Sequence, residues 1–286
     1  MRANASRDER WRRLEGVVDP AILRDKNVLV AGLGSGGSTV ALELAKAGVG
    51  RFTLIDPDRI EESNLIRHEC DDRYLGWNKA EAVADLILHR NPEAEVQAMP
   101  FDLLRMDGVV SLEVAGAALV AVCTDAEPPK HLLNRFCTAM EVPAVYAGVY
   151  DRATGGEVIR CPGGAEDACY ACVTSVLKES VPVADGSQLD YGAIGPDGVL
   201  HAAPGLGLDV RLVALIQAKV CLATLLEPGP VNGWADLPGN VVLFGTAPIE
   251  GLFPRPLASA FLQVAAQDGC LMCGPLRTGR IAVPGA

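Results

Sequence analysis

A glycine-rich segment near the N-terminus has the residue types of a phosphate-binding loop. Gly32, Gly34 and Gly37 lie within Gly-Leu-Gly-Ser-Gly-Gly, between an apolar strand-like run and a segment with apolar residues at helical spacing. There the first glycine permits a tight turn, the second lets backbone N–H groups approach a phosphate, and the helix presents its partial positive charge. Asp56, ending the next predicted strand, is placed to accept hydrogen bonds from a ribose. These residues predict a nucleotide site rather than a simple βα turn.

The polar residues after this acid distinguish between nucleotides. The run from Asp56 to Arg67 reads Asp-Pro-Asp-Arg-Ile-Glu-Glu-Ser-Asn-Leu-Ile-Arg, and Lys79 follows at the start of a predicted helix. A dinucleotide needs little positive charge beside a neutral nicotinamide, whereas a triphosphate needs cations. Asn64, Arg67 and Lys79 would supply the groups that hold phosphates, which favours ATP over NAD.

Four cysteines form two closely spaced pairs, Cys169-Tyr-Ala-Cys172 and Cys270-Leu-Met-Cys273. Each pair can present two thiolates to one tetrahedral metal ion. Their separation exceeds that of a compact zinc ribbon, so only the fold could bring them together. A redox dithiol and two unrelated buried pairs are the alternatives. Because four thiolates leave no open position for water, a metal here would be structural.

The polar run resembles that of the ThiF/MoeB family, which is related to ubiquitin-activating enzymes. The shared motif is Asp-x-Asp-x-Ile-x-x-Ser-Asn-Leu-x-Arg after a Rossmann glycine loop, here from Asp56 to Arg67. The Lys79-Ala helix start and the Cys-Thr-Asp segment ending at Asp125 also match, and the resemblance extends over most of the chain. His68 stands where relatives usually have glutamine.

The resemblance implies ATP-dependent adenylation of the C-terminal carboxylate of a small ubiquitin-like or sulfur-carrier protein, with release of pyrophosphate. No covalent protein nucleophile is needed for that step, so positioning and charge neutralisation would provide most of the catalysis. Arg67, Lys79 and Asp125 would be catalytic, with Asp125 holding Mg²⁺. The implied ATP-binding residues are Gly32, Gly34, Gly37, Asp56, Asp58, Asn64, Arg67, Lys79 and Asp125.

An arginine near the N-terminus has a further implied role. Arg10-Trp-Arg-Arg13 resembles the family's Arg-aromatic-x-Arg segment, whose second arginine reaches the active site of the other subunit. The resemblance therefore implies a catalytic Arg13 and a homodimer. In other phosphoryl-transfer enzymes an arginine supplied in trans is worth roughly 10³-fold or more. A solvated basic helix face is the alternative, and a heterodimer stays open.

The relatives also set expectations for the cysteines. They carry the same two cysteine pairs on one structural zinc, which implies zinc at Cys169, Cys172, Cys270 and Cys273. Many relatives have a further cysteine in a crossover loop that receives the activated carboxylate, but this chain has none between Cys172 and Cys221. Cys161 is the remaining candidate for a thioester. We expect the acyl adenylate to pass to an external nucleophile instead.

The elements that must position these residues follow from apolar periodicity. Alternating apolar runs and helical patterns predict a Rossmann-like α/β fold: a mostly parallel sheet flanked by helices, extended by antiparallel strands and a zinc-bound C-terminal part. Residues 166–204, rich in Gly, Pro and Asp, are expected to form a crossing or lid loop. Strands are predicted at 27–31, 51–56, 95–99, 117–122, 142–148 and 240–245, and helices at 38–47, 80–89, 129–140 and 206–226.

We divide the chain into three regions of one integrated adenylation domain. Residues 1–26 form an N-terminal helical arm, 27–165 the ATP-binding region, and 166–286 the crossover loop, a helix, the C-terminal strands and the cysteine pairs. Two other functions remain open: an NAD-dependent oxidoreductase and a non-catalytic scaffold subunit of a heterodimeric activating enzyme.

Composition limits the partners. The net charge of −11 over 286 residues gives no electrostatic footprint for nucleic acid or an anionic bilayer. The longest apolar stretch, 206–226, contains Asp209, Arg211 and Lys219, so we expect a buried helix rather than a membrane span. A polar N-terminus without a signal pattern and the close cysteine pairs favour the cytoplasm.

Overall fold

The computed structural model describes residues 7–164, 166–180, 204–226 and 237–277. Within these residues eight strands form one sheet in the order β3-β2-β1-β4-β5-β6-β7-β8. The first five strands pair in parallel and the last three extend the sheet antiparallel. The strands are β1 (Asn27–Ala31), β2 (Arg51–Ile55), β3 (Glu95–Met99), β4 (Leu119–Val122), β5 (Ala144–Val149), β6 (Gly155–Cys161), β7 (Val241–Gly245) and β8 (Ala258–Leu262).

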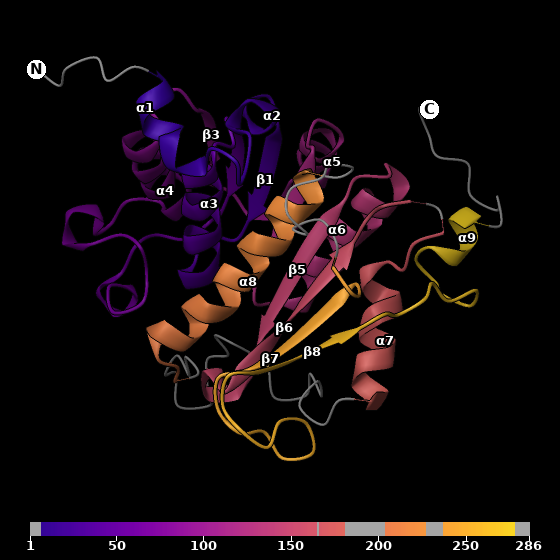
Figure 1. Cartoon of the computed structure of the whole chain (residues 1–286). Helices are drawn as coiled ribbons and strands as arrows, with labels where there is room; N and C mark the ends of the chain where they lie inside the picture. The colour runs from indigo at the N-terminus through magenta and orange to yellow at the C-terminus, as the bar shows by residue number, and fades with distance from the viewer. Residues whose placement is uncertain (1–6, 165, 181–203, 227–236, 278–286) are drawn as a thin grey trace, which may run out of the picture.

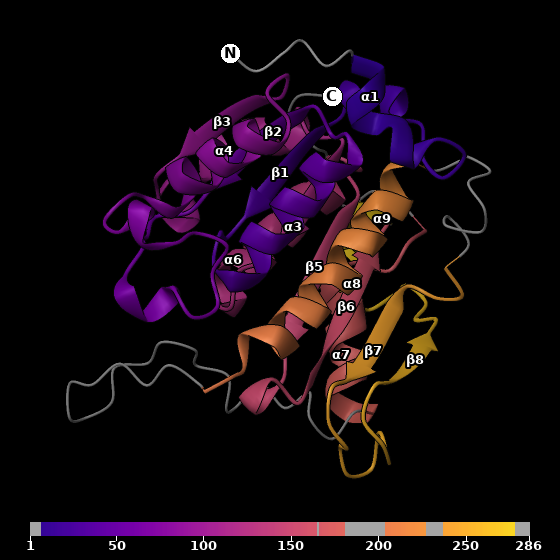
Figure 2. The same ribbon diagram turned by 60° about the vertical axis from the view of Figure 1, so that its left-hand side comes forward.

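Helices cover both faces of this sheet, which confirms the predicted α/β class. α3, α4 and α8 pack on one face and α5, α6 and α7 on the other, each set over its own apolar core (Figures 1 and 2). The helices are α1 (Arg7–Trp11), α2 (Pro20–Arg24), α3 (Ser35–Ala47), α4 (Lys79–Arg90), α5 (Asp107–Ala115), α6 (Glu127–Ala139), α7 (Tyr170–Ser180), α8 (Gly207–Leu225) and α9 (Gly274–Arg277). Short 3-10 helices occupy Arg12–Leu14, Glu62–Asn64, Asp72–Tyr74, Leu103–Arg105 and Asp151–Ala153.

Burial explains why the central strands were readable in the sequence. All four residues of β4 are buried, as are the last four of β1 and β2, because helices cover both faces of a parallel sheet. At the edges, β3 and β8 alternate between more and less exposed residues. Their patterns carry less apolar signal, and β8 is absent from the predicted strands.

Several elements differ from the expectations. The helix predicted at 38–47 begins at Ser35, so the end of the glycine loop is already helical. α5, β6 and β8 were not predicted. β6 begins Gly-Gly-Glu, and only its ladders to β5 and β7 make it a strand.

The loop expected over 166–204 is wrong in its first part, because α7 occupies Tyr170–Ser180. Val173 and Leu177 of this helix are buried in the core beneath the sheet, and that packing favours a helix over a loop. Residues 181–203 lie outside the described part of the chain.

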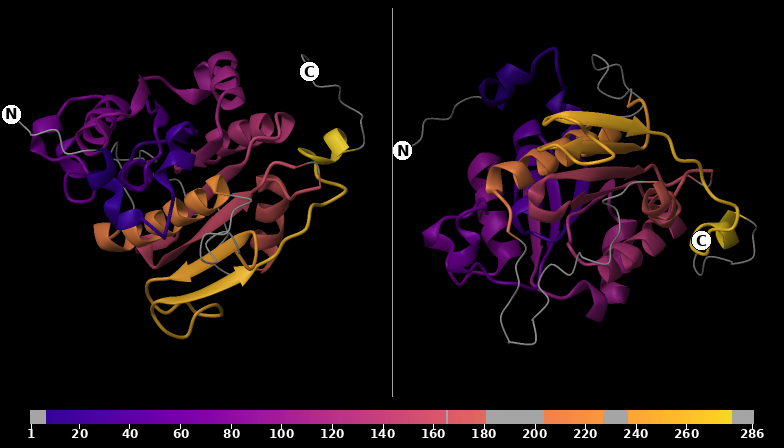
Figure 3. Two further views of the ribbon diagram at one scale, coloured as in Figure 1. Left: turned by 45° about the horizontal axis from the view of Figure 1, so that its top comes forward. Right: turned by 90° about the horizontal axis from the view of Figure 1, so that it is seen from below.

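The C-terminal elements belong to the same sheet as the parallel strands β1 to β5. β7 pairs with β6, and α8 packs against α3, β5 and β6. Figure 3 shows β7 and β8 at one edge of the sheet, with the chain running from β8 to α9. The three-region division stays a prediction. Over the described residues, none of the helices combines the length and apolarity needed to cross a membrane.

One buried amide ties α8 to the sheet. Gln217 Nε2 donates to the carbonyl oxygens of Val122 and Val145, each at 3.0 Å. Its Oε1 accepts from the thiol of Cys123 at 3.4 Å. Val122 and Val145 belong to neighbouring strands, so this one side chain joins α8 to β4 and β5.

We predict that Gln217→Leu destabilises the protein. The change removes the amide donor but leaves two buried carbonyl groups, each costing about 1–3 kcal/mol when unsatisfied. We expect the free energy of unfolding to fall by about 2–4 kcal/mol in urea titrations. Gln263→Leu, at an exposed position beyond β8, is the matched control and should change stability little. Equal losses in the two variants would contradict this role of Gln217.

Candidate functional site

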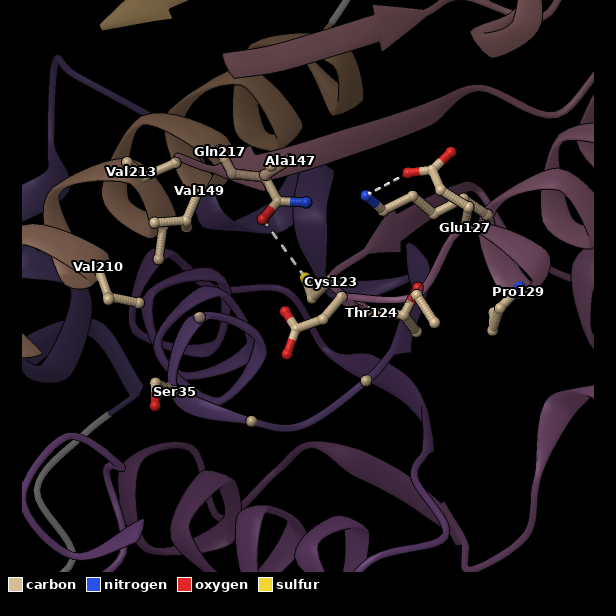
Figure 4. A pocket seen from close by; sticks show the side chains of 18 of the residues that line it. Ser35, Cys123, Thr124, Glu127, Pro129, Ala147, Val149, Val210, Val213 and Gln217 are labelled. Atoms are coloured by element: carbon tan, nitrogen blue, oxygen red, sulfur yellow. Dashed lines mark hydrogen bonds and ion pairs between the residues drawn. The ribbon is translucent and has the colours of Figure 1, made fainter. Parts of the chain in front are cut away.

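A cavity of about 590 Å³ lies at the carboxyl ends of the parallel strands. It spans the point between β1 and β4 where the strand order reverses, which is where open α/β sheets bind ligands. Figure 4 shows its wall. The predicted site residues that line it are Gly32, Gly34, Asp56, Asp58, Asn64, Arg67, Lys79 and Asp125.

The glycines of the loop have different roles. Gly32 has a φ of +86°, the left-handed conformation that favours glycine. A Cβ at Gly34 would meet nothing within 4 Å, so its backbone is open to the cavity. Gly37 does not line the cavity. A Cβ there would collide with the carbonyl oxygen of Gly32 and lie 3.1 Å from Cys123 Cβ, so Gly37 lets α3 pack closely on the sheet.

The carboxylate of Asp56 fixes the glycine loop. Oδ2 accepts from the Leu33 N–H at 2.6 Å, and Oδ1 accepts from the Asp58 N–H at 2.8 Å. Burial raises the pKa of Asp56, while Lys79 and the two backbone N–H groups oppose the rise. The acid expected to bind ribose therefore also joins the loops after β1 and β2.

His68 holds the same loop from the other side. Nε2 lies 2.7 Å from the carbonyl oxygen of Leu33, and Nδ1 accepts from the Cys70 N–H at 3.0 Å. These partners assign the proton to Nε2, and burial lowers the pKa of His68, so the ring is neutral. The residue that departs from the family motif thus supports the loop, which the sequence did not indicate.

Lys79 is held at the cavity wall by its neighbours. Its Nζ lies 2.8 Å from Asp58 Oδ2, and the side chain is only 13% exposed. The preceding Asn78 caps α4 by accepting from the Ala80 N–H, and its amide donates to the carbonyl oxygens of Asp56 and Asp58. Asn78 was not among the predicted site residues, although asparagine directly before a helix is an N-cap signal.

The remaining motif residues lie between β2 and α4. Asn64 Oδ1 accepts from the Glu61 N–H at 3.1 Å in a capping box that fixes this short 3-10 turn. The stem of Arg67 packs at the start of α8, where a Cβ on Gly207 would lie 3.0 Å from Arg67 Cβ. Both side chains therefore reach the cavity from an anchored backbone.

Asp125 follows β4 and lines the same cavity. Withdrawal from bulk water raises its pKa, and three cations oppose that rise: Lys130, Arg67 and Lys79. Beside it, the Thr124 hydroxyl is buried without a hydrogen-bond partner among the described residues. A carboxylate and a free hydroxyl next to cations suit Mg²⁺ and phosphate oxygens.

A further group in the cavity was missed by the sequence analysis. Lys130, only 6% exposed, places Nζ 3.0 Å from Glu127 Oε1. Glu127 is labelled in Figure 4, where a dashed line marks an interaction of its carboxylate. The hydroxyl of Tyr170 donates to the same carboxylate at 3.0 and 3.2 Å. A Glu and a Lys three residues apart at a helix start usually form a surface pair, so their spacing does not indicate a buried pair.

The fold brings the two cysteine pairs together. All four sulfurs lie within 4.8 Å of one another, with neighbours at 3.4, 3.7 and 3.9 Å. A tetrahedral metal with bonds of about 2.3 Å requires sulfur separations of about 3.8 Å. Asn134 Nδ2 lies 3.6 Å from Cys169 Sγ, and the Gln267 N–H lies 3.4 Å from Cys172 Sγ. The cluster therefore fits one metal ion.

The other cysteines near the site are poor nucleophiles. Cys161 is buried, does not line the cavity, and has a pKa raised well above the ordinary thiol value by burial. Cys123 does line the cavity, but it donates to Gln217 and burial raises its pKa to about 12. Both thiols therefore stay protonated near neutral pH.

Arg13 lies away from the cavity of its own chain. It belongs to the exposed turn Arg12–Leu14 near the N-terminus and does not line the cavity. Its role in another subunit stays a prediction.

The glycine loop after β1, the acid after β2 and the cavity at the strand-order reversal define a nucleotide-binding α/β protein of the Rossmann type. Within that class, the ThiF family matches residues 6–240, and the chain belongs to this family.

Similar proteins carry related names. Ubiquitin-like modifier-activating enzyme 5 of Caenorhabditis briggsae is 28% identical over 243 residues, covering 82% of this chain and 53% of that protein. Molybdopterin-synthase adenylyltransferase of Salmonella typhimurium is 31% identical over 187 residues, covering 65% of this chain and 74% of that protein. This chain thus spans about half the length of the nematode enzyme.

The fold is shared with a solved structure of Escherichia coli MccB with ATP. The TM-score is 0.66 at 19% sequence identity, and the match covers 89% of this chain and 68% of that one. At this identity the likeness shows a common fold.

We predict that Cys172→Ser releases the metal. With a full cysteine set, elemental analysis should give about one metal ion per chain, and loss of one thiolate should lower that ratio towards zero. The melting temperature should fall as well, because the metal joins α7 to the segment before α9. Cys161→Ala is the control and should keep the metal. An unchanged metal content in Cys172→Ser would rule out this site.

Proposed function

We propose that this chain uses ATP to adenylate the C-terminal carboxylate of a small ubiquitin-like or sulfur-carrier protein, releasing pyrophosphate. Membership of the ThiF family and the names of its relatives support the proposal. The observation that carries it is the cavity itself, which Asn64, Arg67, Lys79 and Asp125 line together with the glycine loop. A nicotinamide site would not need this concentration of cations and acids.

The proposed reaction joins two anions. A carboxylate oxygen of the carrier attacks the α-phosphorus of ATP, the bond from that phosphorus to the bridging oxygen breaks, and pyrophosphate leaves with the electron pair. Arg67 and Lys79 neutralise phosphate charge, and Asp56 holds the ribose. Asp125 would hold Mg²⁺, which supplies further charge neutralisation when bound.

The metal, the oligomer and the compartment complete the proposal. Four thiolates fit zinc, with no open position for water, so the ion is structural. We further propose a homodimer in which Arg13 enters the partner's cavity, as its exposure on its own chain permits. All nine cysteines are free, which supports a reducing compartment such as the cytoplasm.

Lys79→Met tests the nucleotide end of the site. Carrier-dependent ATP–pyrophosphate exchange should fall about 100-fold or more, because a charged group that stabilises the transition state is lost. Lys46→Met removes the same charge from an exposed ion pair with Glu43 on α3 and should leave exchange unchanged. If the wild-type protein shows no exchange with any small β-grasp carrier, the proposed function is wrong.

Two alternatives have separate outcomes. An NAD-dependent oxidoreductase would change the fluorescence of NADH on titration. A scaffold subunit would bind neither nucleotide productively, and exchange would appear only with a second, different chain present.

Cys161→Ala tests for a covalent step. Since Cys161 is buried and lies outside the cavity lining, we expect product formation to be unchanged, measured as transfer of the activated carboxylate to an added nucleophile. A variant that keeps exchange but loses transfer would require a thioester on Cys161.

A further inference from the structure

The cavity continues beyond the nucleotide-binding residues towards β5 and β6. There it is lined by Gly148 and Glu157 from the sheet, Lys130 from α6, and Tyr170 and Thr174 from α7. None of these belongs to the set assigned to ATP. Adenylation needs two reactants in one cavity, so this second half offers room for the acyl substrate.

Glu157 is built into this second half. It lies directly opposite Gly148 in the antiparallel ladder between β6 and β5. A Cβ on Gly148 would collide with Glu157 Oε1. Because Gly148 has no side chain, the Glu157 carboxylate has space to lie over β5. The pairing of a glycine with this acid directs the carboxylate into the cavity.

One oxygen of this carboxylate is poorly satisfied. Glu157 Oε2 is buried and has no well-aligned hydrogen-bond donor among the described residues. Burial raises the pKa of Glu157, although the charge of Lys130 and a side-chain hydrogen bond from Tyr150 oppose the rise. A buried carboxylate oxygen without an aligned donor is costly, and native proteins seldom keep one without a function.

The neighbouring donors are already engaged. Lys130 Nζ bonds to Glu127, and the Tyr170 hydroxyl donates to the same carboxylate. Tyr150 is directed to Glu157 itself, since burial, the charge of Glu157 and a side-chain hydrogen bond to it together raise the pKa of that phenol. A carboxylate has about four acceptor sites, so capacity remains for a donor from a ligand.

We propose that the second half of the cavity binds the last residues of the acyl substrate and that Glu157 accepts a hydrogen bond from an N–H group of that tail. The donor is either a peptide N–H or a basic side chain. An extended tail of about three residues spans roughly 10 Å. Since both halves belong to one cavity, such a tail would direct its carboxylate towards the nucleotide half. The inference rests on the proposed function and assigns Glu157 as a specificity-determining residue.

The test uses synthetic peptide carboxylates as probes. Acetyl-Arg-Gly-Gly offers a cationic donor, acetyl-norleucine-Gly-Gly only peptide N–H donors, and the same norleucine peptide with N-methylated glycines lacks most of them. Their affinities are measured by calorimetry without turnover, and their KM by ATP–pyrophosphate exchange. Glu157→Leu removes the acceptor, Glu157→Gln keeps a neutral one, and Glu95→Gln at exposed β3 is the control.

We expect Glu157→Leu to weaken the binding of the preferred peptide about tenfold or more, with the KM for ATP unchanged. If the donor is a peptide N–H, N-methylation weakens binding and Glu157→Gln largely restores it. If the donor is a cation, the Arg peptide binds most tightly and Glu157→Gln does not rescue. A melting temperature of Glu157→Leu at or above that of wild type would show that the loss is not misfolding.

Two failures are distinguishable. The subsite is overturned if wild type and Glu157→Leu bind the peptides with equal affinity. It is also overturned if wild type binds none of the peptides, even when intact carriers support exchange. Glu157-dependent peptide binding without exchange from any peptide or carrier supports the subsite and overturns adenylation instead.

Discussion

The bonds of Asp56 to the backbone hold the nucleotide half of the cavity together. The two carboxylate oxygens accept from Leu33 after β1 and Asp58 after β2, so the loops that follow neighbouring parallel strands are fixed to each other. His68 holds the carbonyl of Leu33, and Asn78 holds the carbonyl oxygens on either side of Pro57. The positions of the glycine loop and Lys79 both depend on this arrangement.

The half of the cavity beside β5, β6 and α7 depends on contacts between residues that are far apart in the sequence. Cys172 and Cys273 are separated by 101 positions, yet their sulfurs lie 3.4 Å apart. Tyr170, between the first two cysteines, donates to Glu127 and thereby supports the ion pair with Lys130. A metal at the cysteines would therefore fix one wall of the cavity while staying outside the reaction.

The acids of the cavity are satisfied to different degrees. Asp56 has two backbone donors. Burial acts to raise the pKa of Glu127, but the charge of Lys130 and the hydrogen bonds from Lys130 and Tyr170 lower it overall. Glu157 has one buried oxygen without an aligned donor, and the Tyr150 hydroxyl is its neighbouring donor. Among these three acids, that contrast marks Glu157 as the one with acceptor capacity for a ligand.

The sequence by itself determined the parts whose signal is local. Central strands are continuous apolar runs, the glycine loop has its own spacing, and the motif from Asp56 to Arg67 follows one strand, so all could be read without the fold. Only the tertiary structure decided what depends on distant partners. It made β6 a strand between β5 and β7, brought Lys130 and Glu157 into one cavity, and set the four cysteines around one point. It also placed Cys161 outside the cavity, because burial and distance are properties of packing that spacing along the chain does not contain.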